Sequence, residues 1–327
     1  MRGLVRRSFL SIAAVGLLAP VALAQTPLLA KAEWAAIGQY GDKAAPFTVF
    51  EKDKALYIDG EGFKSARLTA SGGGRYAIVG GGELALESGA VRLNGKILAF
   101  HDFGAETRER IHKAVRADPV SLRQRALAAA PPAEPGEFLP SDLVDVTTID
   151  PGIRLDIRYA GPDNFMGIPL YETPAAYMQR PAAEALGRIH KALAAKGYGL
   201  LIHDAYRPWY VTWMFWEATP PEDHVFVADP AQGSRHNRGC AVDLTLYDLK
   251  TGQAVEMPGG YDEFSTRSYA DFVGGTTAQR ARRAILRQAM EAEGFTVYPE
   301  EWWHFDYRDY RRYPIGTKTF TELGAGR

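Results

Sequence analysis

The sequence predicts an α+β protein in two parts. A small all-β domain comes first, followed by a larger domain in which a small antiparallel sheet is flanked by helices. The chain has 327 residues, 46% of them hydrophobic, which is enough for two domains with a sizeable core. Short β-like runs between Gly-rich turns fill the first third, whereas helical and strand-like segments are mixed after residue 141.

Residues 1–24 have the pattern of a cleaved signal peptide. A basic start, MRGLVRR, precedes a short apolar core from Phe9 to Leu18 and a small-x-small cleavage site at Ala22-Leu23-Ala24. The core is too short for a stable membrane span, and no later segment is apolar enough for one. Arg6-Arg7 also resembles the twin-arginine export signal, so both export routes stay open. We expect a periplasmic or secreted protein with no membrane span when mature.

Residues 32–100 are expected to form the small β domain. The runs 47–50, 56–58, 76–79 and 91–93 read as strands, separated by turns such as Ser71-Gly-Gly-Gly74 and Asn94-Gly95. His101, at the end of this region, has no neighbouring catalytic residue in the sequence, so we expect a structural or surface histidine. The β domain therefore shows no catalytic constellation.

Residues 101–140 are expected to hold one helical segment, from about Glu106 to Ala130, and a stiff linker. The linker is Pro131-Pro132-Ala-Glu-Pro135-Gly136, and we place the domain boundary there. The second domain then spans residues 141–327.

The second domain is expected to contain two clear helices. The first covers 180–196, with Pro181 in its first turn and Gly197 as its stop, and a buried strand follows at 200–202. The second covers 277–293, is capped by Thr276 or Thr277, and is followed by a strand at 295–298.

Composition excludes some classes of function. The formal net charge is −1 and the isoelectric point is near 6.7, so no basic excess favours nucleic acid as a partner. Small molecules or neutral polymers are the expected partners, and the composition does not predict an oligomeric state. The only cysteine, Cys240, has no second cysteine for an intrachain disulfide.

The stretch SRHNRGCAVD, residues 234–243, brings a histidine and an aspartate together. From 241 to 246 polar and apolar residues alternate, so Asp243 faces away from Val242, and Cys240 falls on the Val242 side as a buried, inert thiol. His236 precedes Asp243 by seven residues across a turn at Gly239. This pair alone also fits an ordinary turn that leads into a buried strand.

A third candidate ligand lies downstream, in Glu300-Glu301-Trp302-Trp303-His304. Together His236, Asp243 and His304 would supply three protein ligands and leave one position open, as in catalytic zinc sites, with one Zn²⁺ per chain. Glu301 would then be the general base. Since a regular strand sends positions three apart to opposite faces, this role requires an irregular turn before His304. The alternative is a surface carboxylate beside an aromatic strand.

Arg207, in His203-Asp-Ala-Tyr-Arg207-Pro208, directly follows a predicted buried strand. A cation at a strand end can stabilise the oxyanion that forms when an amide is hydrolysed. The alternative is a structural arginine paired with Asp204.

The pattern Ser234-x-His236-x-x-Gly239-x-Ala241-x-Asp243, followed by Glu301-x-Trp303-His304, resembles the D-alanyl-D-alanine dipeptidases of the VanX type. These belong to a wider group of zinc peptidases that cut cell-wall peptides. Further elements occur in the family order over residues 141–313: Arg158-Tyr159-Ala160, Asp163-Asn164-Phe165-x-Gly167, Asp204 to Pro208, and Tyr261 to Ser265.

The resemblance implies a role for each matching position. His236, Asp243 and His304 would hold zinc, Glu301 would be the base, Arg207 would stabilise the tetrahedral intermediate, Asp262 would recognise the substrate amine, Tyr159 and Tyr171 would line a small pocket, and Ser234 would assist beside the metal loop. For Asp262, the alternative is a turn residue.

The resemblance implies zinc-dependent hydrolysis of D-Ala-D-Ala or a similar short dipeptide. Two alternatives remain open. One is a zinc carboxypeptidase or endopeptidase that acts on peptidoglycan stem peptides, which needs a longer, open cleft. The other is a wall-binding protein with a vestigial zinc site. The β domain is not part of the minimal dipeptidase, so its role is not implied by the resemblance.

Overall fold

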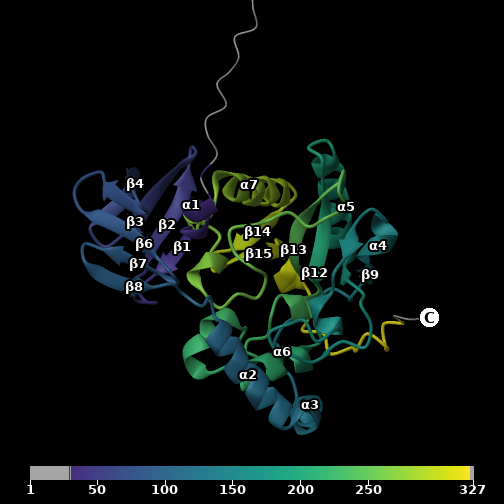
Figure 1. Ribbon diagram of the computed structural model, residues 1–327. Coiled ribbons are helices and arrows are strands. Elements are labelled where there is room, and N and C mark those ends of the chain that lie inside the picture. The colour runs from purple at the N-terminus through teal and green to yellow at the C-terminus, as the bar shows by residue number, and fades with distance from the viewer. Residues whose placement is uncertain (1–28, 30, 325–327) are drawn as a thin grey trace, which may run out of the picture.

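The computed structural model describes residues 29 and 31–324, and Figure 1 shows a β domain beside a larger mixed α/β domain. The predicted signal peptide lies outside the described residues. No helix in the described part of the chain is both long and apolar enough to cross a membrane. Each domain has its own hydrophobic cluster, the smaller one over residues 36–98 and the larger one over residues 111–320.

The β domain is an antiparallel meander in which each strand pairs with the next along the chain. After the short helix α1 (Lys31–Ala35), its strands are β1 (Gly38–Tyr40), β2 (Phe47–Lys52), β3 (Ala55–Gly60), β4 (Phe63–Gly72), β5 (Arg75–Ile78), β6 (Glu83–Glu87), β7 (Ala90–Leu93) and β8 (Lys96–Ala99). A bridge between Tyr40 and Phe100 brings the end of the sheet back to β1, so that the sheet curls into a nearly closed barrel.

The segment after the β domain forms two helices, where we expected one. They are α2 (Ala105–Ala117) and α3 (Pro119–Ala128). The break lies at Asp118, whose side chain accepts a hydrogen bond from the backbone N–H of Ser121, and Pro119 begins the second helix. An N-cap followed by proline starts a new helix because proline removes a backbone donor that the first turn does not need.

These two helices belong to the larger domain, which differs from the boundary that we placed at the Pro-rich linker. Ile111 and Leu122 are buried in its hydrophobic cluster, and α3 packs against α6 (Trp209–Ala218). The structural division between the domains therefore lies near His101, whose Nε2 contacts the carbonyl oxygen of Gly41 at 2.9 Å. Apolar positions on the helices, rather than the prolines that follow, determine where they pack.

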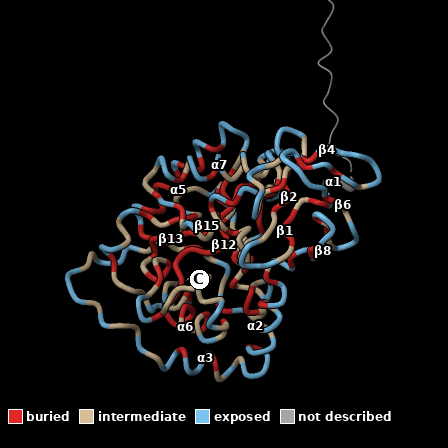
Figure 2. The backbone as a smooth tube through the Cα atoms, turned by 90° about the vertical axis from the view of Figure 1, so that its left-hand side faces the viewer, coloured by how far each residue is buried: buried red, intermediate tan, exposed pale blue. Residues whose placement is uncertain are grey.

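The larger domain is built on a five-stranded sheet in the order β10-β12-β13-β15-β14. Its strands are β10 (Arg154–Leu155), β12 (Tyr198–Asp204), β13 (Ala241–Asp248), β14 (Phe295–Tyr298) and β15 (Glu301–Tyr307). Only β10 and β12 are parallel to each other. A two-stranded sheet pairs β9 (Leu143–Asp145) with β11 (Tyr177–Gln179), and α4 (Val146–Ile149) follows β9. In Figure 2, β12, β13 and β15 lie where buried backbone is concentrated.

Helices α5 (Arg180–Ala194) and α7 (Thr277–Ala292) contact each other and pack on this sheet, as Figure 1 shows. Both were predicted within a few residues. Thr276 caps α7 in a reciprocal capping box with Gln279. Short 3₁₀ turns complete the domain at Arg158–Ala160, Pro221–Phe226, His236–Arg238, Thr266–Ser268 and Tyr310–Arg312.

Candidate metal centre and active site

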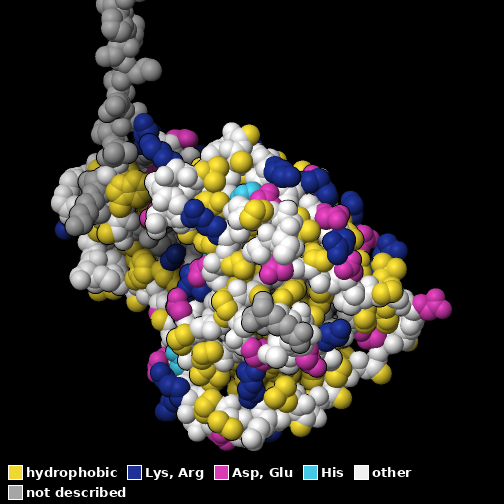
Figure 3. Space-filling model, turned by 90° about the vertical axis from the view of Figure 1, so that its right-hand side faces the viewer, with side chains coloured by type: hydrophobic (Ala, Val, Ile, Leu, Met, Phe, Trp, Pro, Cys, Tyr) yellow, Lys and Arg dark blue, Asp and Glu magenta, His cyan; other side chains and the backbone are white. Residues whose placement is uncertain are grey.

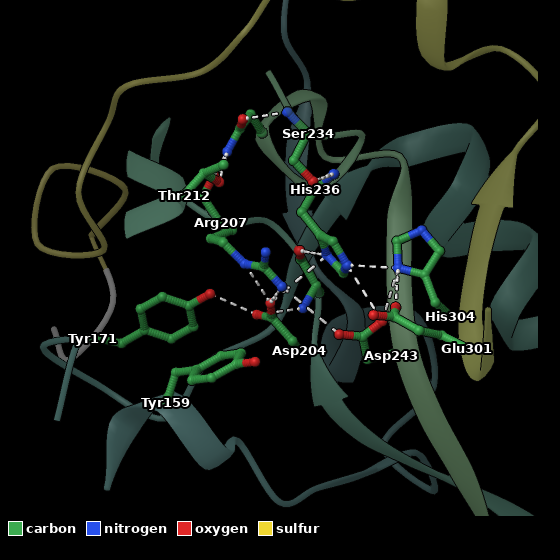
Figure 4. A network of polar contacts seen from close by, with 12 residues as sticks. Tyr159, Tyr171, Asp204, Arg207, Thr212, Ser234, His236, Asp243, Glu301 and His304 are labelled. Atoms are coloured by element: carbon green, nitrogen blue, oxygen red, sulfur yellow. Dashed lines mark hydrogen bonds and ion pairs between the residues drawn. The ribbon is translucent and has the colours of Figure 1, made fainter. Parts of the chain in front are cut away.

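Three elements bring the predicted metal ligands together. His236 begins a 3₁₀ turn that ends at Gly239, whose φ of 66° gives the chain the left-handed residue needed before β13. Asp243 on β13 lies directly opposite His304 on β15 in the sheet register. The side chains converge in Figure 4, and the three residues are only 1%, 2% and 7% exposed, respectively.

The spacing of the ligand atoms fits one zinc ion. His236 Nε2 lies 3.0 Å from His304 Nδ1 and 3.3 Å from Asp243 Oδ1, and His304 Nδ1 lies 3.0 Å from Asp243 Oδ1. Tetrahedral zinc with bonds of about 2.0–2.1 Å separates neighbouring ligand atoms by about 3.3 Å. Two nitrogens and a carboxylate oxygen that face one another at this spacing form a suitable donor set for zinc.

Hydrogen bonds behind the ligands orient both imidazoles. His236 Nδ1 contacts the carbonyl oxygen of Ala205 at 2.6 Å, so Nδ1 donates its proton and Nε2 faces the other ligands. His304 Nε2 lies 2.9 Å from Asp306 Oδ1, which leaves Nδ1 for the metal. Such partners hold the ring and raise its basicity. Asp306 was not predicted as a site residue from the sequence, although its position two residues after His304 on a strand places it on the same face.

The ligand cluster attracts positive charge. Burial alone would raise the pKa of Asp243, but His236 and His304 hold it well below its usual range. Burial alone would lower the pKa of His304, whereas Asp306 and Asp243 raise it to about 10. The carboxylates therefore stabilise a cation at this point, in line with the donor set.

Glu301 lies beside the ligands because β15 is irregular. The register with β14 shifts between Val297 and Tyr298, so that residues 302–304 have no counterpart on the shorter strand. This is the irregularity that a role for Glu301 required. Its Oε2 is 3.7 Å from His304 Nδ1. Burial, only partly offset by His304, raises the pKa of Glu301 to about 7, which suits proton transfer near neutral pH.

Arg207 has the pairing with Asp204 that the sequence offered as an alternative, and its guanidinium also lies beside the ligand cluster. It forms a buried ion pair with Asp204, and its Nη2 also lies 3.8 Å from Asp243 Oδ2 (Figure 4). Burial alone would lower the pKa of Arg207, but Asp204 raises it well above its usual value, so the guanidinium stays charged. Tyr171 donates a hydrogen bond to Asp204 Oδ1 at 2.6 Å.

A cavity of about 100 Å³ lies over this cluster. Every predicted site residue except Tyr171 lines it, which differs from the pocket role that the resemblance implied for this tyrosine. Tyr171 lies behind Arg207 and Asp204 instead, because its hydroxyl is turned toward the buried ion pair. Pockets for drug-sized ligands measure about 300–1,000 Å³, so this cavity suits a small substrate.

Asp262 and Tyr159 form part of the cavity wall. Tyr159 donates a hydrogen bond to Asp262 Oδ2 at 2.8 Å, and Asp262 has a left-handed φ of 53°. Burial and then the charge of Asp243 raise the pKa of Asp262 well above its usual value. A substrate cation placed against this carboxyl group would stabilise its ionised form.

Ser234 and Tyr261 complete the site, whereas Cys240 is not among the residues that line the cavity. Ser234 Oγ accepts a hydrogen bond from the N–H of His236 at 3.2 Å and so supports the metal loop. Tyr261 donates to Asp243 Oδ2 at 3.1 Å, a contact that the sequence analysis did not assign. Cys240 is buried, and burial raises the pKa of its thiol to about 12, in line with the inert cysteine that we expected.

The surface gives no sign of a single-sign charged face in the view of Figure 3, where Lys and Arg side chains are interspersed with Asp and Glu. This agrees with the formal net charge of −1. Among the described residues, the cluster of His236, Asp243 and His304 is the group of ligands close enough to hold a metal ion.

Comparisons with known proteins agree with the site. The profile of the Peptidase_M15 family, described as D-ala-D-ala dipeptidase, matches residues 140–321. The D-alanyl-D-alanine dipeptidase of Escherichia coli is 34% identical over 181 residues, which cover 55% of this chain and 92% of that protein. The dipeptidase of Enterococcus faecium is 37% identical over 178 residues, covering 48% of this chain and 87% of that protein.

The D-alanyl-D-alanine dipeptidase of Streptomyces coelicolor is 34% identical over 189 residues, covering 51% of this chain and 92% of that protein. A solved LD-carboxypeptidase structure aligns at 18% identity over 59% of this chain and 78% of that chain, and its TM-score of 0.31 is too low to support an argument. Since the family profile matches more than half of the chain, and the chain spans nearly the whole of these relatives, the protein belongs to the D-Ala-D-Ala dipeptidase family and is a peptidase.

Proposed function

We propose that the protein is a zinc-dependent dipeptidase that hydrolyses D-Ala-D-Ala or a similarly short dipeptide. One observation carries this proposal: the ligand triad, Glu301, Arg207 and Asp262 all line the same small cavity. The names of the relatives point to the same substrate. Intact ligand and base positions disfavour a wall-binding protein with a vestigial site.

His236, Asp243 and His304 would hold one Zn²⁺. When bound by three such ligands, zinc lowers the pKa of a water molecule and polarises a carbonyl oxygen. Glu301 takes the proton of the attacking water and passes it to the leaving amine. Arg207, held by Asp204, presents positive charge beside Asp243 where negative charge develops on the carbonyl oxygen.

The size of the cavity and the position of Asp262 both favour a short substrate. A free α-amine can pair with the Asp262 carboxylate, which is buried and bonded to Tyr159. A stem peptide has no free amine at that position and needs more room than a cavity of about 100 Å³. This favours a dipeptide over the attached stem peptides that a carboxypeptidase or endopeptidase would cut. The leader-like residues 1–24 make the periplasm or the extracellular space our proposed location.

The experiment is hydrolysis by the purified, zinc-loaded protein of D-Ala-D-Ala, acetyl-D-Ala-D-Ala and a stem pentapeptide. The proposal expects release of D-alanine from the free dipeptide and little from the other two. Preferential cleavage of the pentapeptide would instead support the carboxypeptidase alternative.

A further inference from the structure

The β domain lies outside the residues matched by the family profile, yet it contacts the loop that carries Asp262. This loop, residues 258–276, connects the end of the β13 region to α7 and is here called the Asp262 loop. Apart from the 3₁₀ turn Thr266–Ser268, it contains no helix or strand. Its conformation therefore depends on contacts with neighbouring elements.

The first contact joins β1 to the middle of the loop. Gln39 Nε2 donates to Thr266 Oγ1 at 2.8 Å, and Thr266 Oγ1 lies 3.1 Å from Gln39 Oε1. Gln39 is only 2% exposed. A buried amide whose oxygen and nitrogen both contact one hydroxyl group fixes the position of that hydroxyl.

The second contact joins β2 to the end of the loop and the start of α7. The N–H of Thr277 donates to Glu51 Oε2 at 2.6 Å, and the N–H of Glu51 donates to the carbonyl oxygen of Gly275 at 3.1 Å. Arg280 donates to the carbonyl oxygen of Glu51 at 2.5 Å. A side chain of the β domain thus caps a helix of the catalytic domain.

The third contact lies between these two. The guanidinium of Arg267 stacks on the ring of Phe103 at 3.9 Å from its centroid. Gly104 lies so close to Phe264 that a Cβ at this glycine would be 2.6 Å from the Cβ of Phe264. The segment that leaves the β domain is therefore packed tightly on the loop.

Hydrogen bonds inside the loop connect these contacts to Asp262. Glu263 accepts from the N–H of Gly260 at 2.8 Å and from the hydroxyl of Ser265, and it pairs with Arg267 at 3.3 Å. Asp262 lies between Gly260 and Glu263 with φ 53°, in the left-handed region, which aspartate adopts more readily than most residues other than glycine but still less often than the right-handed regions.

The catalytic domain also holds the loop at both ends. At the near end Tyr159 donates to Asp262, and Tyr261 donates to Asp243. The N–H of Ala270 donates to the carbonyl oxygen of Pro299 at 2.9 Å, and Arg283 donates to the carbonyl oxygens of Tyr269 and Phe272. These bonds fix residues 269–272. The middle of the loop, between these two sets of bonds, contacts the β domain through Thr266 and Arg267.

We propose that the β domain is a brace for the Asp262 loop, with Gln39 and Glu51 as positioning residues that hold Asp262 at the cavity wall. This inference rests on the proposed binding of a substrate amine by Asp262. The β domain then tunes recognition of the free amine without contacting the substrate.

The test compares kinetics on free and acetylated D-Ala-D-Ala for variants on both sides of the contact. Gln39→Ala removes the β-domain partner, and Thr266→Val removes the loop partner without removing bulk. Each should raise KM for the free dipeptide about three- to tenfold, as expected for one lost hydrogen bond, with kcat and zinc content nearly unchanged. Hydrolysis of the acetylated peptide should not change.

Two controls separate bracing from general damage. Glu87→Gln breaks the Glu87–Arg92 ion pair on the β domain and should leave the kinetics unchanged. In the Asp262→Ala background, adding Gln39→Ala should produce no further loss, because residues that act through one another are not additive. Equal losses on both peptides, or additive losses in the double variant, would overturn the inference.

Hydrogen exchange keeps the inference testable if the dipeptide proves to be the wrong substrate. Amides of residues 259–268 should exchange faster in Gln39→Ala and Thr266→Val than in the parent and in Glu87→Gln. Absence of dipeptidase activity in the parent would contradict the proposed function alone. Unchanged exchange in both variants would contradict the brace.

Discussion

Two nitrogens of Arg207, Nε and Nη2, bind the same oxygen of Asp204, at 2.9 and 2.8 Å. The other oxygen of Asp204 accepts from the Tyr171 hydroxyl at 2.6 Å and from the N–H of Ala205 at 2.9 Å. Both oxygens of this fully buried carboxylate therefore accept hydrogen bonds. The two bonds from Arg207 fix the orientation of its guanidinium group. We therefore expect a substitution of Arg207 to affect both catalysis and stability.

Arg207→Ala should lower kcat about a hundredfold or more with little change in KM, because oxyanion stabilisation belongs to the transition state. The same change should lower the free energy of unfolding by about 3–5 kcal/mol, since it leaves Asp204 buried without its counter-charge. Arg207→Lys keeps a charge but not the planar fork, so it should restore stability better than rate. Steady-state kinetics and denaturant unfolding measure the two effects. A raised KM with normal kcat would show instead that Arg207 grips the substrate carboxylate.

Removing the metal should abolish hydrolysis, and added Zn²⁺ should restore it. His236→Ala should lose the metal, whereas Asp306→Asn should keep all three ligands and weaken zinc affinity by about 10–100-fold, because His304 loses the partner that orients it. Metal titration with a competing chelator gives both affinities. Full activity in metal-free protein would refute the zinc mechanism.

Acetylation of the substrate amine should reduce kcat/KM by about 10–150-fold, which corresponds to about 1.5–3 kcal/mol for a hydrogen bond to a charged group. Asp262→Ala should weaken hydrolysis of the free dipeptide and narrow the gap between the free and acetylated forms. Four values of kcat/KM, from two peptides and two proteins, make the comparison. If the mutant still rejects the acetyl group, the exclusion is steric.

The contact between the two domains should weaken in acid. Burial alone would raise the pKa of Glu51, but hydrogen bonds from the N–H groups of Thr277 and Lys54 lower it below its usual 4.5. The unfolded chain then binds the proton more readily than the folded one, so this contribution to stability is present above pH 4.5 and is lost as the pH falls through the folded pKa.

The free energy of unfolding should therefore fall less between neutral and acidic pH in Glu51→Gln than in the parent. The expected difference is about 1 kcal/mol, the typical value of a helix cap. Unfolding curves at several pH values between neutral and strongly acidic measure this difference. Glu87→Gln serves as the control and should follow the parent. If the free energy of unfolding falls equally with decreasing pH in the parent and in Glu51→Gln, the capping role is contradicted.

Much of the fold and of the site could be predicted from local sequence patterns. The bounds of α5 and α7 followed from apolar periodicity and from caps such as Thr276, which act within a few residues. The strand β4 was missed because most of its residues are exposed and only Leu68 is buried, so hydrophobic alternation is weak. The break at Asp118 was missed although Asp118-Pro119 is a local signal for the start of a new helix, because the apolar pattern continues on both sides of it.

In the candidate site, too, local motifs could be predicted from the sequence and long-range contacts could not. His236, Asp243 and His304 could be proposed because each lies in a short, distinctive motif. The cap that Glu51 places on Thr277 joins residues 226 positions apart, and no local pattern predicts it. Asp204 was assigned only as an alternative partner of Arg207, because a single sequence does not show that Tyr171 turns its hydroxyl toward the same carboxylate.

The most direct measurement compares the parent with Glu301→Gln, each loaded with one Zn²⁺ per chain, for release of D-alanine from D-Ala-D-Ala. Glutamine keeps the shape of Glu301 but cannot accept the proton of the attacking water, so both proteins should bind zinc equally. The parent should turn over, and the variant should lose about 10²–10⁴-fold in kcat. Loss of zinc in the variant, or equal rates in the two proteins, would contradict the account.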